Sequence, residues 1–241
     1  MSNILTKKQF TWEMLGSPYL LFLIVLYVTF NLLGTTLIYK LVVVGPGLAP
    51  GGLFVLPFVL LIEDVIAEVY GYAISRLILW LIVFSSIIFT ILAFLIIHLP
   101  SPAYWHFQTD FNVVFTPMLR GAPAFMFAIL IARFINIYII AKSKIIVAGR
   151  FFWIRSIFSS MCGGLIGVFI AFLLAYGTSV PWVGIEKLIL TDYFLRFIYA
   201  TCGGGIAWLL VIYLKNKEKI DVYDVGTNFN PFKLSIKNEG K

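Results

Sequence analysis

Charged residues are scarce in this chain. The 18 Lys and Arg and the 11 Asp and Glu together make up 12% of its 241 residues, about half the share that is typical of soluble domains. Hydrophobic residues make up 61% of the chain and include 23 Phe, 12 Tyr and 6 Trp. Because so few charged side chains cannot cover the surface around so large an apolar content, the composition excludes a soluble domain.

Cysteine and histidine are rarer still, with two of each. Cys162 and Cys202 both lie within apolar stretches, which argues against a structural disulfide or a zinc site made of several thiolates. His98 and His106 lack supporting carboxylates or thiols, so an interfacial position is favoured over metal binding. We therefore expect no metal and no cofactor.

Sequence signatures of catalysis are also missing. The chain has no Gly-rich phosphate loop of the Walker type, no His-Glu-x-x-His zinc helix and no Gly-x-Ser-x-Gly nucleophile elbow. We expect a protein that is not an enzyme and that does not itself hydrolyse ATP.

Long apolar runs dominate what is present. A helix needs about 20 residues to cross the hydrocarbon core of a bilayer, and six runs meet that need: 18–44, 53–73, 77–97, 119–141, 156–176 and 190–214. They predict an all-α integral membrane protein with six transmembrane helices in residues 18–214. The first run is too long for a signal peptide and is expected to remain as a span. It follows a short segment, 1–17, and the polar tail 215–241 is not expected to fold by itself.

The basic residues predict the orientation. Short loops and tails rich in Lys and Arg stay on the cytoplasmic side of a membrane. In a six-span thread one side collects most of them: Lys7, Lys8, Arg76, Lys142, Lys144, Arg150, Arg155 and the lysines of the tail. We therefore expect a multi-pass membrane protein with both termini in the cytoplasm.

Three carboxylates interrupt the second apolar run, at Glu63, Asp64 and Glu68. A charged side chain at the centre of a spanning helix costs about 2.5–3.5 kcal/mol, so these groups must face protein or water. At about 100° per residue, Glu63 points away from Asp64. The stripe on the side of Asp64 consists of Pro57, Asp64, Glu68 and Gly71. Because Pro57 also frees a backbone carbonyl there, we predict that this stripe is a cavity wall.

Two arginines in other runs offer partners for these acids. Arg133 lies near mid-membrane in the fourth run, with Asn136 one turn on. Arg196 follows Asp192 in the sixth run at the spacing of a local ion pair. Asp64 could pair with an arginine only to hold helices together, but a functional role is favoured for it, because ionisable groups inside membranes mark functional sites. Both interpretations stay open for Arg133, and a structural pair is favoured for Asp192 with Arg196.

Weaker signals have two interpretations each. Asn31 in the first run can hydrogen-bond a neighbouring helix or a ligand, and packing is the commoner use. The glycines of the fifth run, among them Gly164 and Gly167, can bring helices close together or leave room for a ligand. The 45–52 connection is rich in Gly and Pro; a plain loop is favoured over one that dips into a pocket mouth.

The residues from Pro57 to Tyr72, followed by Arg76 and Trp80, resemble the signature of the queuosine precursor transporters of the VUT (vitamin uptake transporter) family. The likeness covers all six runs. Its other elements are Asn31 with the two leucines after it, Arg155 with Ser156 and Ser159, and Asp192 with Tyr193, followed by Arg196 where the family usually has Lys.

The resemblance implies a six-helix inner-membrane importer, related in shape to the substrate-binding subunits of energy-coupling-factor transporters. Its substrates would be the deazaguanine bases preQ0 and preQ1, or queuine, which serve tRNA modification. Asp64 is implied as a substrate contact, with Asn31, Glu68, Arg155 and Arg196 less firmly. The implied partners are a small deazapurine and the lipid bilayer; a homodimer is left open, and no nucleic acid is bound directly.

The chain departs from the family pattern at four positions. Arg133 and Asn136 stand where many members have Gln-x-x-Asp, and Gly164 and Gly167 stand where they have an amide and an acid. A deazaguanine would lose hydrogen bonds here, while the glycines add space and Arg133 adds positive charge. These departures favour a larger or more anionic substrate, and Arg133 and Asn136 remain candidate contacts.

Two rival functions follow from the same residues. A passive binding subunit would need a separate ATP-driven partner and would carry another small heterocycle or vitamin. A structural membrane protein would hold the same ion pairs and bind no saturable ligand. An importer that holds its substrate between the second, fourth, fifth and sixth spans, near the bilayer midplane, is the favoured hypothesis.

Overall fold

The computed structural model describes residues 12–38, 40–45, 47–176 and 182–233. Within these ranges it has six α-helices: α1 (Pro18–Leu37), α2 (Leu56–Tyr70), α3 (Tyr72–Ile97), α4 (Gln108–Ile146), α5 (Phe152–Tyr176) and α6 (Trp182–Glu218). The other elements are two strands, β1 (Leu41–Val44) and β2 (Gly47–Pro50), and two 3-10 helices, η1 (Trp12–Gly16) and η2 (Gly51–Phe54). The predicted all-helical membrane fold is confirmed.

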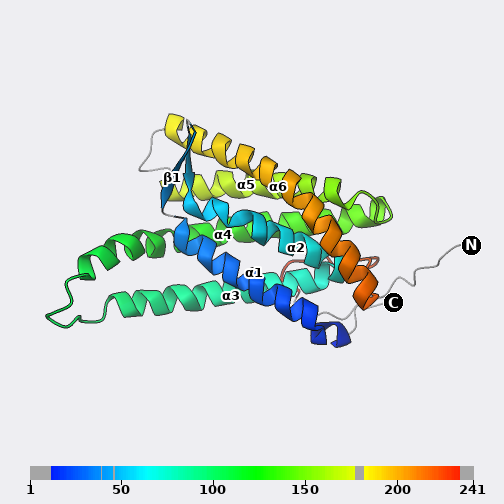
Figure 1. Ribbon diagram of the computed structural model, residues 1–241, viewed down its shortest axis with the longest axis horizontal. Coiled ribbons are helices and arrows are strands. Elements are labelled where there is room, and N and C mark those ends of the chain that lie inside the picture. Colours follow the sequence, from blue (N-terminus) through cyan, green and yellow to red (C-terminus); the bar gives the residue numbers. More distant parts are fainter. Residues whose placement is uncertain (1–11, 39, 46, 177–181, 234–241) are drawn as a thin grey trace, which may run out of the picture.

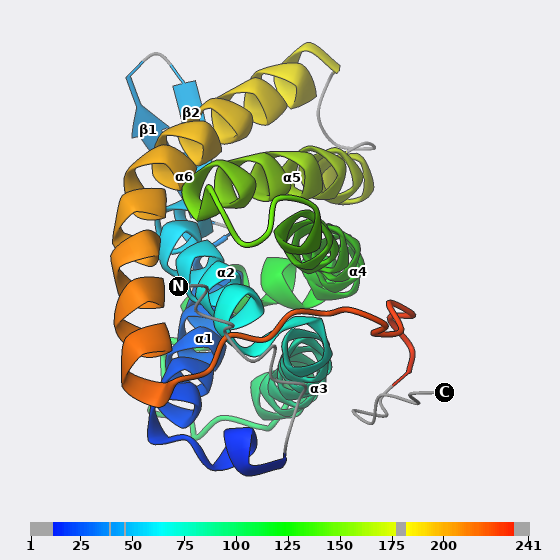
Figure 2. The same cartoon turned by 90° about the vertical axis from the view of Figure 1, so that its right-hand side faces the viewer.

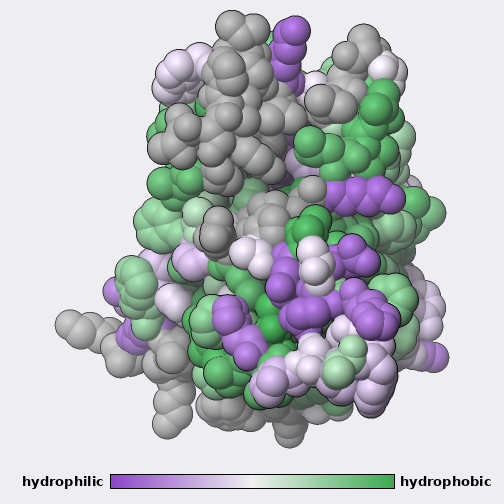
Figure 3. Space-filling view, turned by 90° about the vertical axis from the view of Figure 1, so that its left-hand side faces the viewer, coloured by the Kyte–Doolittle hydropathy of each residue, from purple (hydrophilic) through white to green (hydrophobic). Residues whose placement is uncertain are grey.

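The helices lie along the long axis of the molecule (Figure 1). At one end, which we call the hairpin end, β1 pairs with β2 in an antiparallel hairpin near the start of α6, and the α3–α4 connection lies farther out at the same end. At the other end, the tail end, α6 finishes and the chain continues into residues 219–233. A view onto the hairpin end shows hydrophilic residues gathered in its lower half, with hydrophobic residues at both sides (Figure 3).

Helix α2 is the enclosed element of the bundle. Among the described residues, five helices are long and apolar enough to cross a membrane, and α2 is not one of them. With 15 residues it is only about 22 Å long, and it contacts every other helix. All residues from Ile62 to Tyr70 are buried, whereas apolar side chains such as Phe84 and Leu92 on α3 are exposed. The carboxylates of α2 therefore face protein and not lipid, as the sequence predicts.

Several helix boundaries differ from the predicted runs. The first run, 18–44, ends as a helix at Leu37, and its last residues form β1. The second run, 53–73, is divided by Gly71 into α2 and the start of α3. Helices α4 and α6 extend well beyond their apolar cores, and α6 continues through Glu218 into the expected tail. The 45–52 connection includes β2 and the start of η2 and is not a plain loop.

The start of α1 has the residues that are usual at the N-terminus of a helix. Ser17 precedes the helix in extended conformation, and its hydroxyl accepts a hydrogen bond from the backbone N–H of Leu20 at 3.2 Å. Pro18 occupies the first helical position, where its missing N–H costs nothing.

Residues 219–233, which we call the C-terminal strap, lie across the tail end of the bundle (Figure 2). The backbone N–H of Tyr72, the first residue of α3, donates to Asp224 Oδ2 at 2.9 Å. Arg76 donates to the carbonyl of Asn228 at 2.9 Å, and the indole N–H of Trp80 donates to that of Pro231 at 2.8 Å. Burial raises the pKa of Asp224, although its hydrogen bond with Tyr72 opposes that change. The strap thus gains its conformation from the bundle, consistent with a tail that does not fold alone.

Substitution of Gly71 is expected to loosen this strap. Gly71 has φ 83° and ψ 176°, a region that only glycine occupies without strain, and a Cβ there would lie 2.7 Å from Val222 Cγ1. We expect Gly71→Ala to lower the free energy of unfolding by about 1–3 kcal/mol and to speed proteolysis within 219–233. Gly205→Ala is the control, because a Cβ at Gly205 meets nothing within 4 Å. Equal stability of the two variants would contradict the prediction.

Candidate functional site

Glu63 is the centre of a buried polar cluster in the middle of the bundle. Its Oε2 accepts hydrogen bonds from the Tyr27 hydroxyl on α1, at 2.8 Å, and from the Arg133 guanidinium on α4. Its Oε1 accepts from Asn136 Nδ2 at 3.1 Å. Glu63 is 2% exposed and Arg133 6%, so this ion pair is sheltered from lipid and from water. The partner of Arg133 is therefore Glu63.

Asp64 has no cationic partner among the described residues. Its Oδ1 accepts from Asn136 Nδ2 at 2.8 Å. Its Oδ2 accepts from the hydroxyls of Ser156 and, at 3.4 Å, Ser160 on α5. The interpretation that Asp64 pairs with an arginine to hold helices together does not describe this structure.

The predicted stripe on α2 is only partly a cavity wall. Pro57 and Asp64 line a small hollow of about 250 Å³ between α2, α5 and α6, where Tyr199 also lies. Glu68 instead belongs to an ion cluster at the tail end, and Gly71 packs against the strap. The stripe fails beyond Asp64 because these last turns of α2 meet the ends of other helices, which fill the space.

A larger cavity lies toward the hairpin end and encloses about 670 Å³, part of it open to solvent. Pro50, the last residue of β2, and Gly52 in η2 contribute to its wall, so this connection does reach a pocket. The lining is mainly apolar. Its charged members are Arg133, Asp192 and Arg196.

Asp192 and Arg196 form a local pair inside this cavity. The Arg196 Nε and Nη2 atoms donate to Asp192 Oδ2 at 3.3 and 3.1 Å. Within the described part of the chain, Asp192 Oδ1 accepts no hydrogen bond, and Arg133 donates only through Nη1, to Glu63. Gly164 adjoins Arg196 so closely that a Cβ there would overlap the Arg196 side chain. The cavity wall thus has one hydrogen-bond acceptor and several hydrogen-bond donors that are available to a ligand.

Asn31 lines a second space of about 520 Å³ that shares Arg133 with the larger cavity. Asn31 is 8% exposed, and its side chain makes no hydrogen bond with the described residues. The packing interpretation of Asn31 therefore lacks a partner here, and the ligand interpretation stays a prediction.

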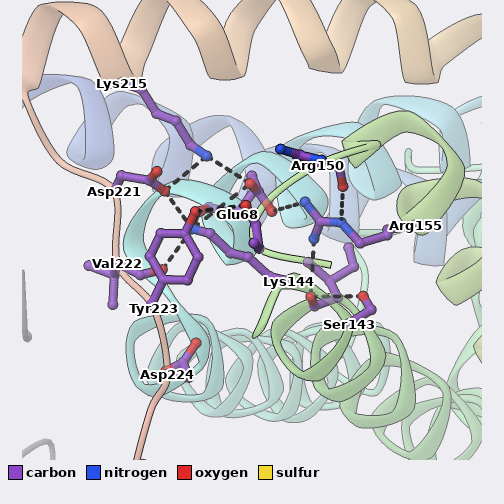
Figure 4. Close-up of polar contacts among 12 residues, drawn as sticks. Glu68, Ser143, Lys144, Arg150, Arg155, Lys215, Asp221, Val222, Tyr223 and Asp224 are labelled. Carbon is purple, nitrogen blue, oxygen red and sulfur yellow. Dashed lines mark hydrogen bonds and ion pairs between the residues drawn. The ribbon is translucent and has the colours of Figure 1, made fainter. Parts of the chain in front are cut away.

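Glu68 lies in what we call the tail-end ion cluster (Figure 4). Glu68 is fully buried, and its carboxylate pairs with Arg155 at 2.9 Å, with Lys215 at 2.7 Å and with Lys144 at 3.8 Å. Asp221 of the strap pairs with Lys144 at 2.6 Å and with Lys215 at 2.9 Å. Lys144 also donates to the backbone carbonyls of Glu68 and Val222. The cluster joins α2, α4, α5, α6 and the strap.

The predicted site residues therefore fall into three groups. Asp64 and Asn136 lie with Glu63 in the middle, Arg133 connects that group to the cavity where Arg196 and Asn31 lie, and Glu68 and Arg155 belong to the tail-end ion cluster. The residues without a predicted role are Tyr27, Glu63, Lys144, Ser160, Lys215 and Asp221. Glu63 has a sequence signal, since it is a carboxylate inside an apolar run, but its direction depends on the neighbouring helices.

The comparison with known families bears on this arrangement. Residues 50–211 match the model of the family described as "Putative vitamin uptake transporter". The chain belongs to this family. The matched segment begins at the last residue of β2 and ends within α6. It contains Glu63, Asp64, Arg133 and Asn136 of the buried polar cluster and all three charged residues of the cavity. No curated protein and no solved structure matches the chain.

Membership of the vitamin uptake transporter family fits the geometry. The family consists of membrane transporters and not of enzymes, which agrees with the absence of catalytic motifs. A transporter implies a small-molecule substrate and a surrounding bilayer. The cavity, with an apolar wall and a few polar groups that converge on it, has the form of a small-molecule site.

Proposed function

We propose that this transporter imports a queuosine precursor, preQ0, preQ1 or queuine, through the cavity at the hairpin end. The tail end would face the cytoplasm, because the basic residues Arg76, Lys144, Arg155 and Lys215 lie there. The resemblance of the α2 sequence to the precursor transporters supports the choice of substrate.

One observation carries the proposal: the cavity presents an acceptor beside donors on an apolar wall. A deazaguanine has two parallel donors, the ring N–H and the exocyclic amine, next to a carbonyl acceptor. Asp192 Oδ1 is available to accept from those donors, and Arg196 or Arg133 to donate to the carbonyl. Hydrogen bonds to charged groups are among the strong ones, and they separate guanine-like from adenine-like edges.

The contact expected of Asp64 thus falls to Asp192. Asp64 lies on the other side of the cluster, against Ser156, and has its acceptors in use. Gly164 and Gly167 line the cavity, and both also allow close packing, since a Cβ at Gly164 would overlap Arg196 and one at Gly167 would overlap Ala132.

Release into the cytoplasm would require the tail end to open. The tail-end ion cluster and the strap close that end in this structure. Access would then alternate by rocking of helices around the cavity.

Asp192→Asn is expected to reduce precursor uptake strongly. The substitution keeps the shape but removes the charge that strengthens the contact, and a hydrogen bond to a charged group contributes about 1.5–3 kcal/mol. We expect a corresponding fall of about 10- to 100-fold in apparent affinity. The measurement is the queuosine content of tRNA, against external precursor concentration, in a strain that lacks its own precursor transporter.

Asp110→Asn is the matched control, because Asp110 is exposed at the start of α4. A correctly inserted Asp192→Asn variant that imports all three bases as well as the parent would refute the proposed contact. Thermal shift of the purified parent with each base, guanine and several vitamins identifies the ligand, since binding to the native state raises apparent stability. If only a vitamin raised the apparent stability, the substrate would be that vitamin and not a queuosine precursor.

A further inference from the structure

The buried acids in the middle of α2 outnumber the cations beside them. Glu63 and Asp64 are 2% and 1% exposed, and Arg133 alone pairs with either of them among the described residues. With both acids ionised, the cluster carries one uncompensated negative charge. A buried charge without a partner is strongly unfavourable.

Within the part of the chain that the structure describes, no other cation pairs with Asp64 or Glu63. Arg155, one residue before Ser156 on α5, pairs with Glu68 instead. The titratable, charged or hydrogen-bonding groups that face the acid pair are Tyr27 from α1, Arg133 and Asn136 from α4, Ser156 and Ser160 from α5, and Tyr199 from α6. Apart from Arg133, these groups are neutral.

A second observation at the same place is an acceptor without a donor. Asn136 is 2% exposed and gives its Nδ2 hydrogens to Glu63 and Asp64, while its Oδ1 has no hydrogen-bond partner among the described residues. Buried polar atoms are nearly always paired. The cluster therefore lacks both a positive charge and a hydrogen-bond donor.

The small hollow beside Asp64 brings hydroxyl groups next to this acid. Its wall includes the hydroxyl-bearing residues Ser156, Ser160 and Tyr199, which can each donate and accept hydrogen bonds. A proton on Asp64 Oδ2 keeps the contact with Ser156, because that hydroxyl can turn from donor to acceptor.

We propose that Asp64 binds and releases one proton in each transport cycle, so that import is coupled to proton entry. This inference rests on the proposed function. In the proton-bound state Asp64 is a neutral carboxylic acid, and the charge of Glu63, Asp64 and Arg133 together is zero. On release the O–H bond of that acid breaks, the electron pair stays on the carboxylate, and the proton passes to water.

Arg133 couples this proton to the substrate, because it lies both in the cavity and on Glu63. When a substrate accepts a hydrogen bond from Arg133, the ion pair between Arg133 and Glu63 weakens. The two acids, Glu63 and Asp64, then have less positive charge beside them. The acid pair then binds a proton more tightly, and by linkage the proton strengthens substrate binding to the same extent.

Infrared spectroscopy of the full-length protein in lipid bilayers tests the proton site without any substrate. At neutral pH we expect the C=O stretching band of a protonated, buried carboxyl group, which is lost in Asp64→Asn, is kept at a shifted frequency in Asp64→Glu, and is unchanged in Asp110→Asn. A band of equal intensity in the parent and in Asp64→Asn would overturn the proposal.

Uptake into proteoliposomes tests the coupling. We expect an inward proton gradient to concentrate the precursor several-fold in the parent, and Asp64→Asn to equilibrate it without concentrating it. Concentration driven by a sodium gradient alone, or concentration by Asp64→Asn, would overturn proton coupling while the import function stands. Absence of uptake and of any ligand-induced thermal shift, together with an Asp64-dependent carboxyl band, would refute the import function and support the proton site.

Discussion

Replacing Glu68 by Gln is expected to destabilise the folded protein by about 3–5 kcal/mol, the usual effect of removing one partner from a buried ion pair. Glu68 is fully buried and balances Arg155, Lys144 and Lys215. After the substitution, Asp221 would be the acid that remains beside these cations in the tail-end ion cluster. The side chain of Asp221 is 20% exposed. The measurement is the free energy of unfolding of the purified protein in a mild detergent.

Glu186→Gln serves as the matched control, since Glu186 is an exposed residue on α6. We expect it to change stability by less than about 0.5 kcal/mol, as surface substitutions do. Glu68→Asp keeps the charge on a shorter side chain and should fall between the two. If Glu68→Gln is as stable as the control, the tail-end ion cluster does not hold the helices together.

The tail-end ion cluster also explains how the strap adopts a defined conformation without a hydrophobic core of its own. Asp221 contributes ion pairs, and Val222 contributes a backbone hydrogen bond to Val69 at 3.1 Å. Asp224 accepts the first orphan N–H of α3, a position where a negative charge is also favoured by the helix dipole. The strap thus completes helix ends that the bundle leaves unsatisfied.

The apolar runs predicted the helices well because a spanning helix must be apolar over its whole length. Boundaries are less predictable where polar residues continue a helix beyond its apolar core, as at Gln108 and Glu218. The division at Gly71 was also missed, since a single glycine between two apolar helices leaves the run unbroken. The three valines of β1 and the Gly- and Pro-rich residues after them form a strand signal that the long first run concealed.

Candidate site residues could be found from composition, but not their partners. Arg133, Asn136 and the α2 acids stand out because ionisable groups are rare in apolar runs. Which acid meets Arg133 depends on the rotation and depth of α4 relative to α2, and a difference of one residue exchanges Glu63 for Asp64. Lysines such as Lys144 are ordinary markers of orientation in a sequence, and their long side chains reached a buried acid only in the folded protein.

Alanine substitutions at two neighbouring glycines on α5 are expected to have different effects, one on substrate affinity and the other on stability. A Cβ at Gly164 would overlap the Arg196 side chain, which can move at the expense of its pairing with Asp192 and of the cavity. We therefore expect Gly164→Ala to fold normally and to lose precursor affinity by about 10- to 100-fold, equivalent to about 1.5–3 kcal/mol for a hydrogen bond to a charged group. The measurements are the precursor concentration that gives half-maximal uptake and the ligand-induced thermal shift.

Gly163→Ala is the contrasting variant, one residue away on the same helix. Its Cβ would lie 2.5 Å from the backbone carbonyl oxygen of Ala132, so α4 and α5 would have to separate. Overpacking of this kind costs about 1–3 kcal/mol, and we expect less folded protein but unchanged affinity in the fraction that folds. If Gly163→Ala lost affinity and Gly164→Ala lost only stability, the proposed substrate contact beside Arg196 would be wrong.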